Sequence, residues 1–228
     1  MGALAGYMRP ALAVLAKDAL LELRTKDIIV SVPVFALLVI VIFNFALDPT
    51  PSTVAMIGPG ILWVSYTFGA VLGLNRSFAI ESDRGNVHGL MLAPVGRDAI
   101  YFGKLASNLL YLFLLEICVL PMLLVMFDTN LYHPVILLGL FLGTLGYAEV
   151  GTFFAALTAN TRARESMLPV LLLPVMVPVF MAGVSLTAGI LDGRPISGLV
   201  SWLVILAVFD VIFFIAAYWI VDLIWDGI

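Results

Sequence analysis

The positive charges of this 228-residue chain lie in alternate intervals between six long apolar stretches. All but one of its 11 Lys and Arg residues precede the first stretch, or separate the second from the third or the fourth from the fifth. Loops rich in Lys and Arg remain in the cytoplasm when a membrane protein is inserted. The pattern therefore predicts an all-α integral membrane protein with six transmembrane helices and both termini in the cytoplasm. The exception is Arg194, and the residues on the cytoplasmic side are Arg9, Lys17, Arg24, Lys26, Arg76, Arg84, Arg97, Lys104, Arg162 and Arg164.

Composition agrees with a membrane protein of one domain. Hydrophobic residues make up 63% of the chain and charged residues 11%, and the mean hydropathy is +1.14, which excludes an ordinary soluble domain. A bilayer core requires roughly 20 apolar residues per helix. Six spans therefore occupy nearly all of residues 1–228, and a second folded domain is not expected. Cys118 is the only cysteine, so neither a disulfide nor a cysteine-based metal cluster is expected.

Residues 1–27 are expected to lie in the cytoplasm and to include an amphipathic helix on the membrane surface. A helix over residues 11–24 would have one apolar face and one basic face. The apolar face consists of Leu12, Leu15, Ala16, Ala19 and Leu23, and the basic face of Lys17 and Arg24.

The six predicted spans cover about 28–47, 54–74, 101–127, 134–159, 166–190 and 198–224. The fifth contains Pro169, Pro174 and Pro178. Each proline removes a backbone donor from the helix, so neighbouring helices must satisfy the freed carbonyl groups. The fifth span is therefore expected to be kinked and buried in protein.

The longest polar interval, residues 75–100, is predicted to lie in the cytoplasm. Glu81, Asp83 and Arg84 would extend the second helix beyond the membrane, and Gly85 can end it. A short helix with an apolar face that includes Leu90 and Met91 would follow, before Pro94 breaks the chain. Such a helix, joined rigidly to a transmembrane helix, could dock in a groove of a partner and transmit its motion. The alternative is a solvated loop that only connects two helices.

This interval resembles the segment after the second helix of type 2 ABC exporter permeases, including Gly103-Lys104 at the start of the third helix. Other stretches narrow the resemblance to the CcmB family, a family of haem exporter proteins of cytochrome c maturation. They are residues 22–26 before the first span, 37–49 at its end, Pro59-Gly60-Ile61-Leu62-Trp63-Val64 in the second span and 173–180 in the fifth. One departure is His88-Gly89, which stands where permeases often have residues that favour a helix, and it would shift the coupling helix.

The resemblance implies a permease component in the bacterial inner membrane that couples ATP hydrolysis by a partner to the export or release of haem. It implies as partners an ABC ATPase (CcmA-like), a haem-handling membrane protein (CcmC-like), a small membrane protein (CcmD-like) and a second copy of the chain, and no nucleic acid. The coupling residues would be Glu81, Asp83, Arg84, Gly85, Leu90, Met91 and Pro94. The alternatives are a permease of another type 2 ABC exporter, a proton-coupled secondary carrier and a membrane anchor without a transport step of its own.

The chain itself is not expected to be an enzyme or to hold a cofactor. It contains no G-x-x-x-x-G-K-[ST] phosphate loop, so ATP would be hydrolysed by a separate protein. Its two histidines, His88 and His133, both lie outside the predicted spans, which argues against an integral cytochrome with paired axial histidines. Most of its four tryptophans are expected to be interfacial anchors.

Three carboxyl groups fall inside predicted spans: those of Glu116, Glu149 and Asp210. A charged carboxylate at the centre of a span costs at least about 2.5 kcal/mol. Each is therefore expected to be protonated or to face a polar cavity. They could form a substrate or proton path, or they could form interhelical hydrogen bonds as neutral acids. Four glycines of the fourth span would allow close helix packing around Glu149: Gly139, Gly143, Gly146 and Gly151.

Overall fold

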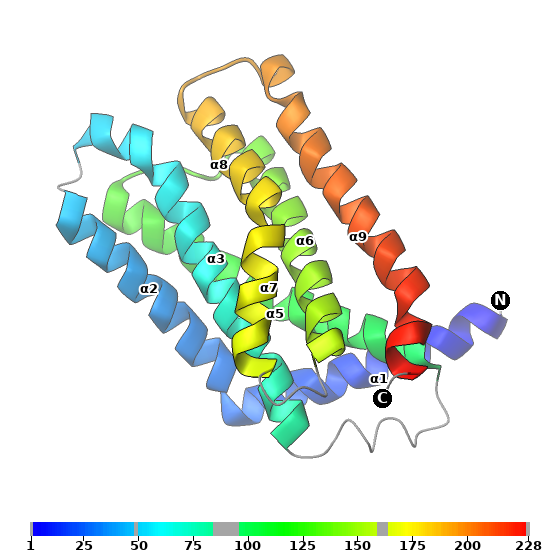
Figure 1. Cartoon of the computed structure of the whole chain (residues 1–228). Helices are drawn as coiled ribbons and strands as arrows, with labels where there is room; N and C mark the ends of the chain where they lie inside the picture. Colours follow the sequence, from blue (N-terminus) through cyan, green and yellow to red (C-terminus); the bar gives the residue numbers. More distant parts are fainter. Residues whose placement is uncertain (1, 48–49, 84–95, 159–163, 227–228) are drawn as a thin grey trace.

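The computed structural model describes residues 2–47, 50–83, 96–158 and 164–226 (Figure 1). Within these ranges the chain is helical and contains no strand. The elements are α1 (Gly2–Thr25), α2 (Asp27–Leu47), α3 (Pro51–Asp83), α5 (Arg97–Phe127), α6 (Pro134–Thr158), α7 (Arg164–Val175), α8 (Val177–Leu191), the 3-10 helix η1 (Ile196–Gly198) and α9 (Val200–Asp226).

Five of these helices, α2, α3, α5, α6 and α9, are long and apolar enough to cross a membrane. The pair α7 and α8 passes the same test together but bends by 54°. Counting the pair as one span gives up to six, the number expected from the sequence. The break falls at Met176, between Pro174 and Pro178, where the kink was predicted.

The bent span is less buried than predicted. Leu172, Met176 and Val179 face the core, but Val170 is 69% exposed and Met181 is 56% exposed on the opposite side. The expectation of a span enclosed in protein is therefore wrong. Helical hydrogen bonds continue on both sides of the break: the backbone N–H of Met176 donates to the carbonyl of Leu172, at 3.0 Å, and that of Phe180 donates to the carbonyl of Met176, at 2.9 Å.

Two helices form the centre of the bundle. In the most apolar 18-residue stretch of α3, and likewise of α6, 67% is buried inside the protein. The corresponding share is 22% in α2 and 17% in α9. Figure 1 shows α2 and α9 on opposite flanks, with α3, α6, α7 and α8 between them. The two flanking helices therefore present most of their apolar surface to lipid or to partners.

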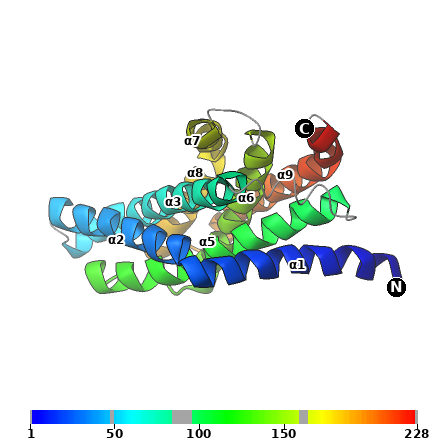
Figure 2. The same ribbon diagram turned by 90° about the horizontal axis from the view of Figure 1, so that it is seen from below.

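Helix α1 lies apart from the bundle axis and runs alongside the first half of α5 (Figure 2). It ends where Lys26 adopts a left-handed conformation, with φ of 59°, and α2 begins at the next residue. An independent N-terminal helix was predicted, and it is longer than residues 11–24. We call the end of the bundle at which α1 lies, where α3 ends and α5 begins, the α1 end.

The faces of α1 are only partly those predicted. Leu12 and Leu23 are exposed, as expected for side chains that would lie on a membrane, and Lys17 is exposed as well. A third face of α1, which the sequence pattern did not indicate, contacts α5 and α2. This face is formed by Val14, Asp18 and Glu22, all buried at a spacing of four residues.

Candidate functional site

The coupling segment predicted from the sequence is described only at its edges. Helix α3 runs without interruption to Asp83, so the backbone at Glu81 and Asp83 is helical. Helix α5 begins at Arg97. The remaining predicted coupling residues lie outside the described residues, as does His88. They are Arg84, Gly85, Leu90, Met91 and Pro94.

The Gly103-Lys104 pair, which the sequence analysis placed at the start of the third span, joins α5 to α1. A Cβ atom on Gly103 would lie 2.8 Å from Cβ of Val14 and 2.9 Å from the carbonyl oxygen of Ala11, so only glycine permits this approach. Nζ of Lys104 lies 2.8 Å from Oδ2 of Asp18, and both side chains are buried. Lys104 is therefore held inside the protein and is not a free cytoplasmic charge.

Glu22 connects α1 to α2. Its Oε1 atom accepts hydrogen bonds from the backbone N–H groups of Ile28, at 2.6 Å, and Ile29, at 2.8 Å. These are donors of the first turn of α2, which have no partner within the helix. A negative charge at a helix N-terminus is also favoured by the helix dipole. The 2% exposed Glu22 therefore acts as a cap supplied by the preceding helix.

A chain of hydrogen bonds crosses the centre of the bundle from α3 through α6 to α5. The hydroxyl of Tyr66 donates to Oγ1 of Thr144 at 2.7 Å, and Thr144 donates to Oε2 of Glu116 at 3.0 Å. The hydroxyl groups of Thr67 and Tyr147 also share a hydrogen bond of 2.6 Å between α3 and α6. Glu116 thus has the interhelical partner that the sequence analysis offered as one alternative.

A second chain lies closer to the α1 end. Oγ of Ser77 donates to Oδ1 of Asn108 at 2.8 Å, and Nδ2 of Asn108 donates to Oγ1 of Thr152 at 2.9 Å. The hydroxyl of Thr152 in turn donates to the carbonyl of Ala148, so each of these polar side chains has a partner. Polar side chains join α3, α5 and α6 in this way at two levels of the bundle.

Trp63 on α3 is buried against α6 and α8 and is 1% exposed, so it is not one of the interfacial anchors expected among the four tryptophans. Its indole lies against two glycines: a Cβ on Gly143 would be 2.6 Å from the ring, and one on Gly183 would be closer still. Its Nε1–H donates to Oγ1 of Thr187 at 3.1 Å. The Pro-Gly-Ile-Leu-Trp run, part of the family resemblance, therefore supplies a packing element.

Glu149 and Asp210 are arranged differently from Glu116. Glu149 on α6 is 2% exposed and Asp210 on α9 is 5% exposed, and the two carboxyl groups interact electrostatically. Oε2 of Glu149 and both carboxyl oxygens of Asp210 are buried without a hydrogen-bond partner among the described residues. The hydroxyl of Tyr101, on α5, is also buried without a partner and interacts electrostatically with Glu149.

The glycines of α6 allow side chains of other helices to approach closely, as predicted, but only one of these glycines faces a carboxyl group. Gly139 faces Leu186, Gly143 faces Trp63 and Gly151 faces Leu74. At Gly146, a Cβ would lie 2.9 Å from Oδ1 of Asp210. The missing side chain therefore lets the Asp210 carboxyl lie directly against α6.

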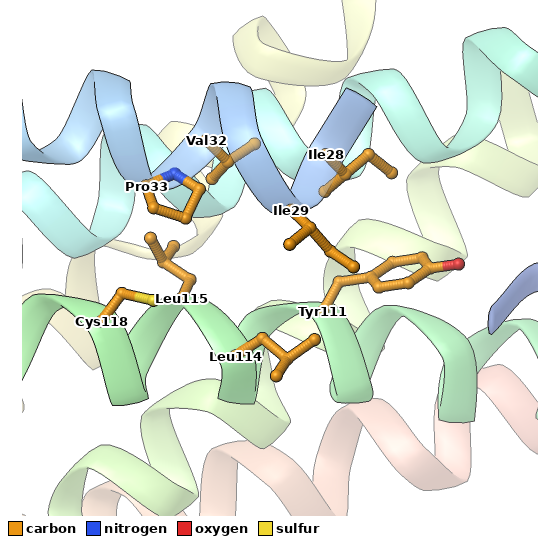
Figure 3. A pocket seen from close by; sticks show the side chains of 8 residues that line it. All are labelled: Ile28, Ile29, Val32, Pro33, Tyr111, Leu114, Leu115 and Cys118. Atoms are coloured by element: carbon orange, nitrogen blue, oxygen red, sulfur yellow. The ribbon is translucent and has the colours of Figure 1, made fainter. Parts of the chain in front are cut away.

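Two apolar pockets formed by the described residues are too small for haem. One lies between α2 and α5 and is lined by side chains that include Val32, Pro33, Tyr111 and Cys118 (Figure 3). Its volume is about 70 Å³, and a second pocket beside the Met176 break has about 230 Å³. Small-molecule sites usually measure roughly 300–1,000 Å³.

His133 also has a structural contact. Its Nδ1 atom accepts the backbone N–H of Val135 at 3.3 Å, in the first turn of α6. This hydrogen bond gives a partner to one of the backbone N–H groups of the first turn, which have none within the helix. His133 therefore has a structural contact at the start of α6.

Comparison with known proteins identifies a family. The model of the CcmB protein family matches residues 9–220. A heme exporter protein B of Pseudomonas aeruginosa is 28% identical over 190 residues, which cover 83% of this chain and 85% of the relative. Proteins of the same name from Rhodobacter capsulatus and Paracoccus denitrificans are each 30% identical, over 76% and 73% of this chain and over 80% and 77% of their own lengths.

Proposed function

The chain belongs to the CcmB family, and from this premise we propose that it is the membrane component of an ABC-type complex for cytochrome c maturation. Relatives that align over most of its length are named heme exporter protein B. A separate ATPase would supply the energy, and the complex would export haem or release it to a neighbouring protein. This chain would convert the motion of the ATPase into motion of its helices.

One observation supports the coupling role most directly: the segment 84–95 is anchored on both sides in core helices. Helix α3 enters it at Asp83 and α5 leaves it at Arg97. These helices share buried hydrogen bonds and the main hydrophobic core, which includes Leu74 of α3 and Leu112 of α5. A partner bound at Gly85 to Pro94 would therefore act on α3, one of the two central helices, and on α5, which packs against it.

Helix α1 connects the start of α5 to the flanking helix α2. Displacement of the start of α5 would move Gly103 and Lys104, and with them Asp18 on α1. Glu22 on α1 then holds the first turn of α2. Motion at the segment can in this way reach the flanking helix α2 through buried polar contacts.

The partners follow from the family and from the exposed surface. We propose an ABC ATPase (CcmA-like) at the coupling residues, and a haem-handling protein (CcmC-like) and a small protein (CcmD-like) within the membrane. A second copy of the chain stays a prediction. The apolar faces of α2 and α9 offer surface for such contacts. The alternation of basic intervals supports an inner-membrane location with both termini in the cytoplasm.

Haem would not fit in the pocket between α2 and α5 or in the pocket beside Met176. Neither apolar pocket described above is large enough, and His133 caps α6. We therefore place bound haem at an interface with a partner protein. This arrangement is compatible with either transport of haem or its ATP-driven release.

The coupling role is tested by replacing Leu90 and Met91 together with Asp and measuring how much ATPase co-purifies with the tagged chain. We expect a large loss of the ATPase, because charge in an apolar contact opposes docking. The matched control is Ile196→Asp, an exposed apolar residue at the opposite end of the bundle, which should retain the ATPase. Equal recovery from the double variant and the control would contradict docking at this segment.

A further inference from the structure

Three helices bring polar side chains together at a place that the proposed coupling role does not use. Tyr101 comes from α5, Glu149 from α6 and Asp210 from α9. All three side chains are at least nine-tenths buried. Among the described residues, the Tyr101 hydroxyl, Oε2 of Glu149 and both carboxyl oxygens of Asp210 have no hydrogen-bond partner. Four such atoms in one place are unusual, because buried polar groups are normally satisfied.

Packing alone does not explain this cluster. Glu116, in the same bundle, shows how a buried acid is accommodated here, since Thr144 donates to it and Tyr66 donates to Thr144. Glu149 and Asp210 instead lie close enough to interact electrostatically. The absence of a side chain at Gly146 brings Asp210 against the helix that carries Glu149. Three of the four oxygens of these two acids lack a donor among the described residues, so the two groups cannot both stay charged there without a bound proton or cation.

Tyr101 is a second and independent sign of a ligand. Its hydroxyl is not acidic at neutral pH, is fully buried and interacts electrostatically with Glu149, yet it contacts no acceptor among the described residues. Its ring packs on Ala217, and Phe102 and Phe153 pack against the same small cluster. On α6 and α9, this apolar layer lies between the two acids and the α1 end. The layer therefore separates the cluster from the water at that end.

No described basic side chain is available to neutralise the pair. The buried cation on α5, Lys104, is directed to Asp18 on α1, at 2.8 Å. The titratable groups that face one another at the cluster are thus Tyr101 from α5, Glu149 from α6 and Asp210 from α9. The described side chains therefore supply no positive charge to the two acids.

We propose that Tyr101, Glu149 and Asp210 form a binding site for one small cation inside the membrane, either a proton carried by one of the two carboxyl groups or an alkali-metal ion. Both ligands supply a single positive charge and are recognised by the same oxygen atoms. Binding joins α9 to α5 and α6, and release leaves two acids facing each other. The site does not depend on the ATPase, so it stands or falls separately from the coupling role.

Infrared spectra of the purified full-length chain in lipid vesicles test the site and distinguish the two cations. If the cation is a proton, a carbonyl band of a protonated carboxylic acid is present at neutral pH, shifts in deuterated water and decreases in the double variant Glu149→Gln, Asp210→Asn. If it is an alkali ion, exchanging sodium for choline alters the carboxylate bands of the native chain and leaves those of the double variant unchanged. The control is Glu116→Gln, which removes the hydrogen-bonded acid. The part of the carbonyl band that the double variant loses, or the response to sodium, should persist in this control.

Identical spectra of the native chain and the double variant, in both spectral regions and in both salts, would overturn the proposal. If the double variant does not fold, Tyr101→Phe replaces it, because this change removes one oxygen and keeps the ring on Ala217. It should shift the acid band or weaken the response to sodium. A native spectrum that shows neither signal overturns the site without any variant.

Discussion

Lys104 and Asp18 form a buried ion pair, with 2.8 Å between Nζ and Oδ2, that fastens α5 to α1. The side chain of Asp18 also lies 3.1 Å from Nζ of Lys17, which is exposed. Two positive charges thus flank one carboxylate, but only Lys104 crosses between helices. Because both partners of this contact are buried, its loss would leave a charge without compensation in a region of low dielectric constant.

The first prediction concerns this pair. Lys104→Met should lower the stability of the folded chain by about 3–5 kcal/mol, the usual cost of removing one partner of a buried pair. A lower unfolding temperature in detergent and faster proteolysis of α1 would report the change. Lys17→Met is the matched control and should cost less than about 1 kcal/mol, because an exposed pair contributes little.

A double variant separates the ion pair from packing. Lys104→Met combined with Asp18→Leu removes both charges and retains apolar volume. It should recover most of the lost stability, since replacing a buried pair by apolar residues is often neutral. Equal losses from Lys17→Met and Lys104→Met would contradict the assignment of the α1 contact to Lys104.

The second prediction concerns the contact beside it. Gly103→Ala should destabilise the docking of α1 by about 1–3 kcal/mol, because the added methyl group would overlap Val14 and the carbonyl of Ala11. Gly60→Ala is the control, since no atom lies within 4 Å of its Cβ position. Alanine there should be neutral or stabilising by up to about 1 kcal/mol, because it favours a helix. Similar unfolding temperatures for the two variants would show that α1 does not pack on Gly103.

The sequence predicted the architecture of the chain well and its polar contacts poorly. Apolar length and proline position follow from local composition, so the spans and the break near Pro174 and Pro178 could be located. The burial of Asp18, Glu22 and Lys104 depends on which helices become neighbours. Their spacing along the chain is that of any charged interfacial helix, and no local pattern distinguishes a paired charge from a solvated one.

The partners of the carboxyl groups inside the spans could not be predicted from the sequence either. Each of Glu116, Glu149 and Asp210 was recognised as costly within a membrane, because composition alone shows that. The sequence left open whether they form a path or packing contacts, and it could not assign Thr144 to Glu116. It also suggested packing around Glu149 from the glycines of α6, without indicating that Gly146 receives Asp210. These contacts depend on which helices lie side by side, and the periodicity of a single helix does not indicate its neighbours.

The third prediction concerns the start of α2. Glu22→Ala should leave the backbone N–H groups of Ile28 and Ile29 without an acceptor, at a cost of about 1–3 kcal/mol. Amide hydrogen exchange at these two residues should become faster, while exchange in α6 stays unchanged. Glu22→Gln keeps an acceptor oxygen and should retain most of the protection. If the alanine variant exchanges at the native rate, Glu22 does not cap α2.

The last prediction concerns the packing of Trp63. Gly183→Ala places a methyl group within the indole ring, and α8 cannot move away without losing the hydrogen bond from Trp63 to Thr187. We expect a loss of about 1–3 kcal/mol, typical of an overfilled core, seen as a lower unfolding temperature and altered tryptophan fluorescence. Combining it with Trp63→Leu should restore part of the loss, because the smaller side chain vacates the space that the methyl group needs, so the two changes together should cost less than their sum. Strict additivity of the two changes would contradict direct contact between these residues, and with it the role of the tryptophan in joining α3 to α8.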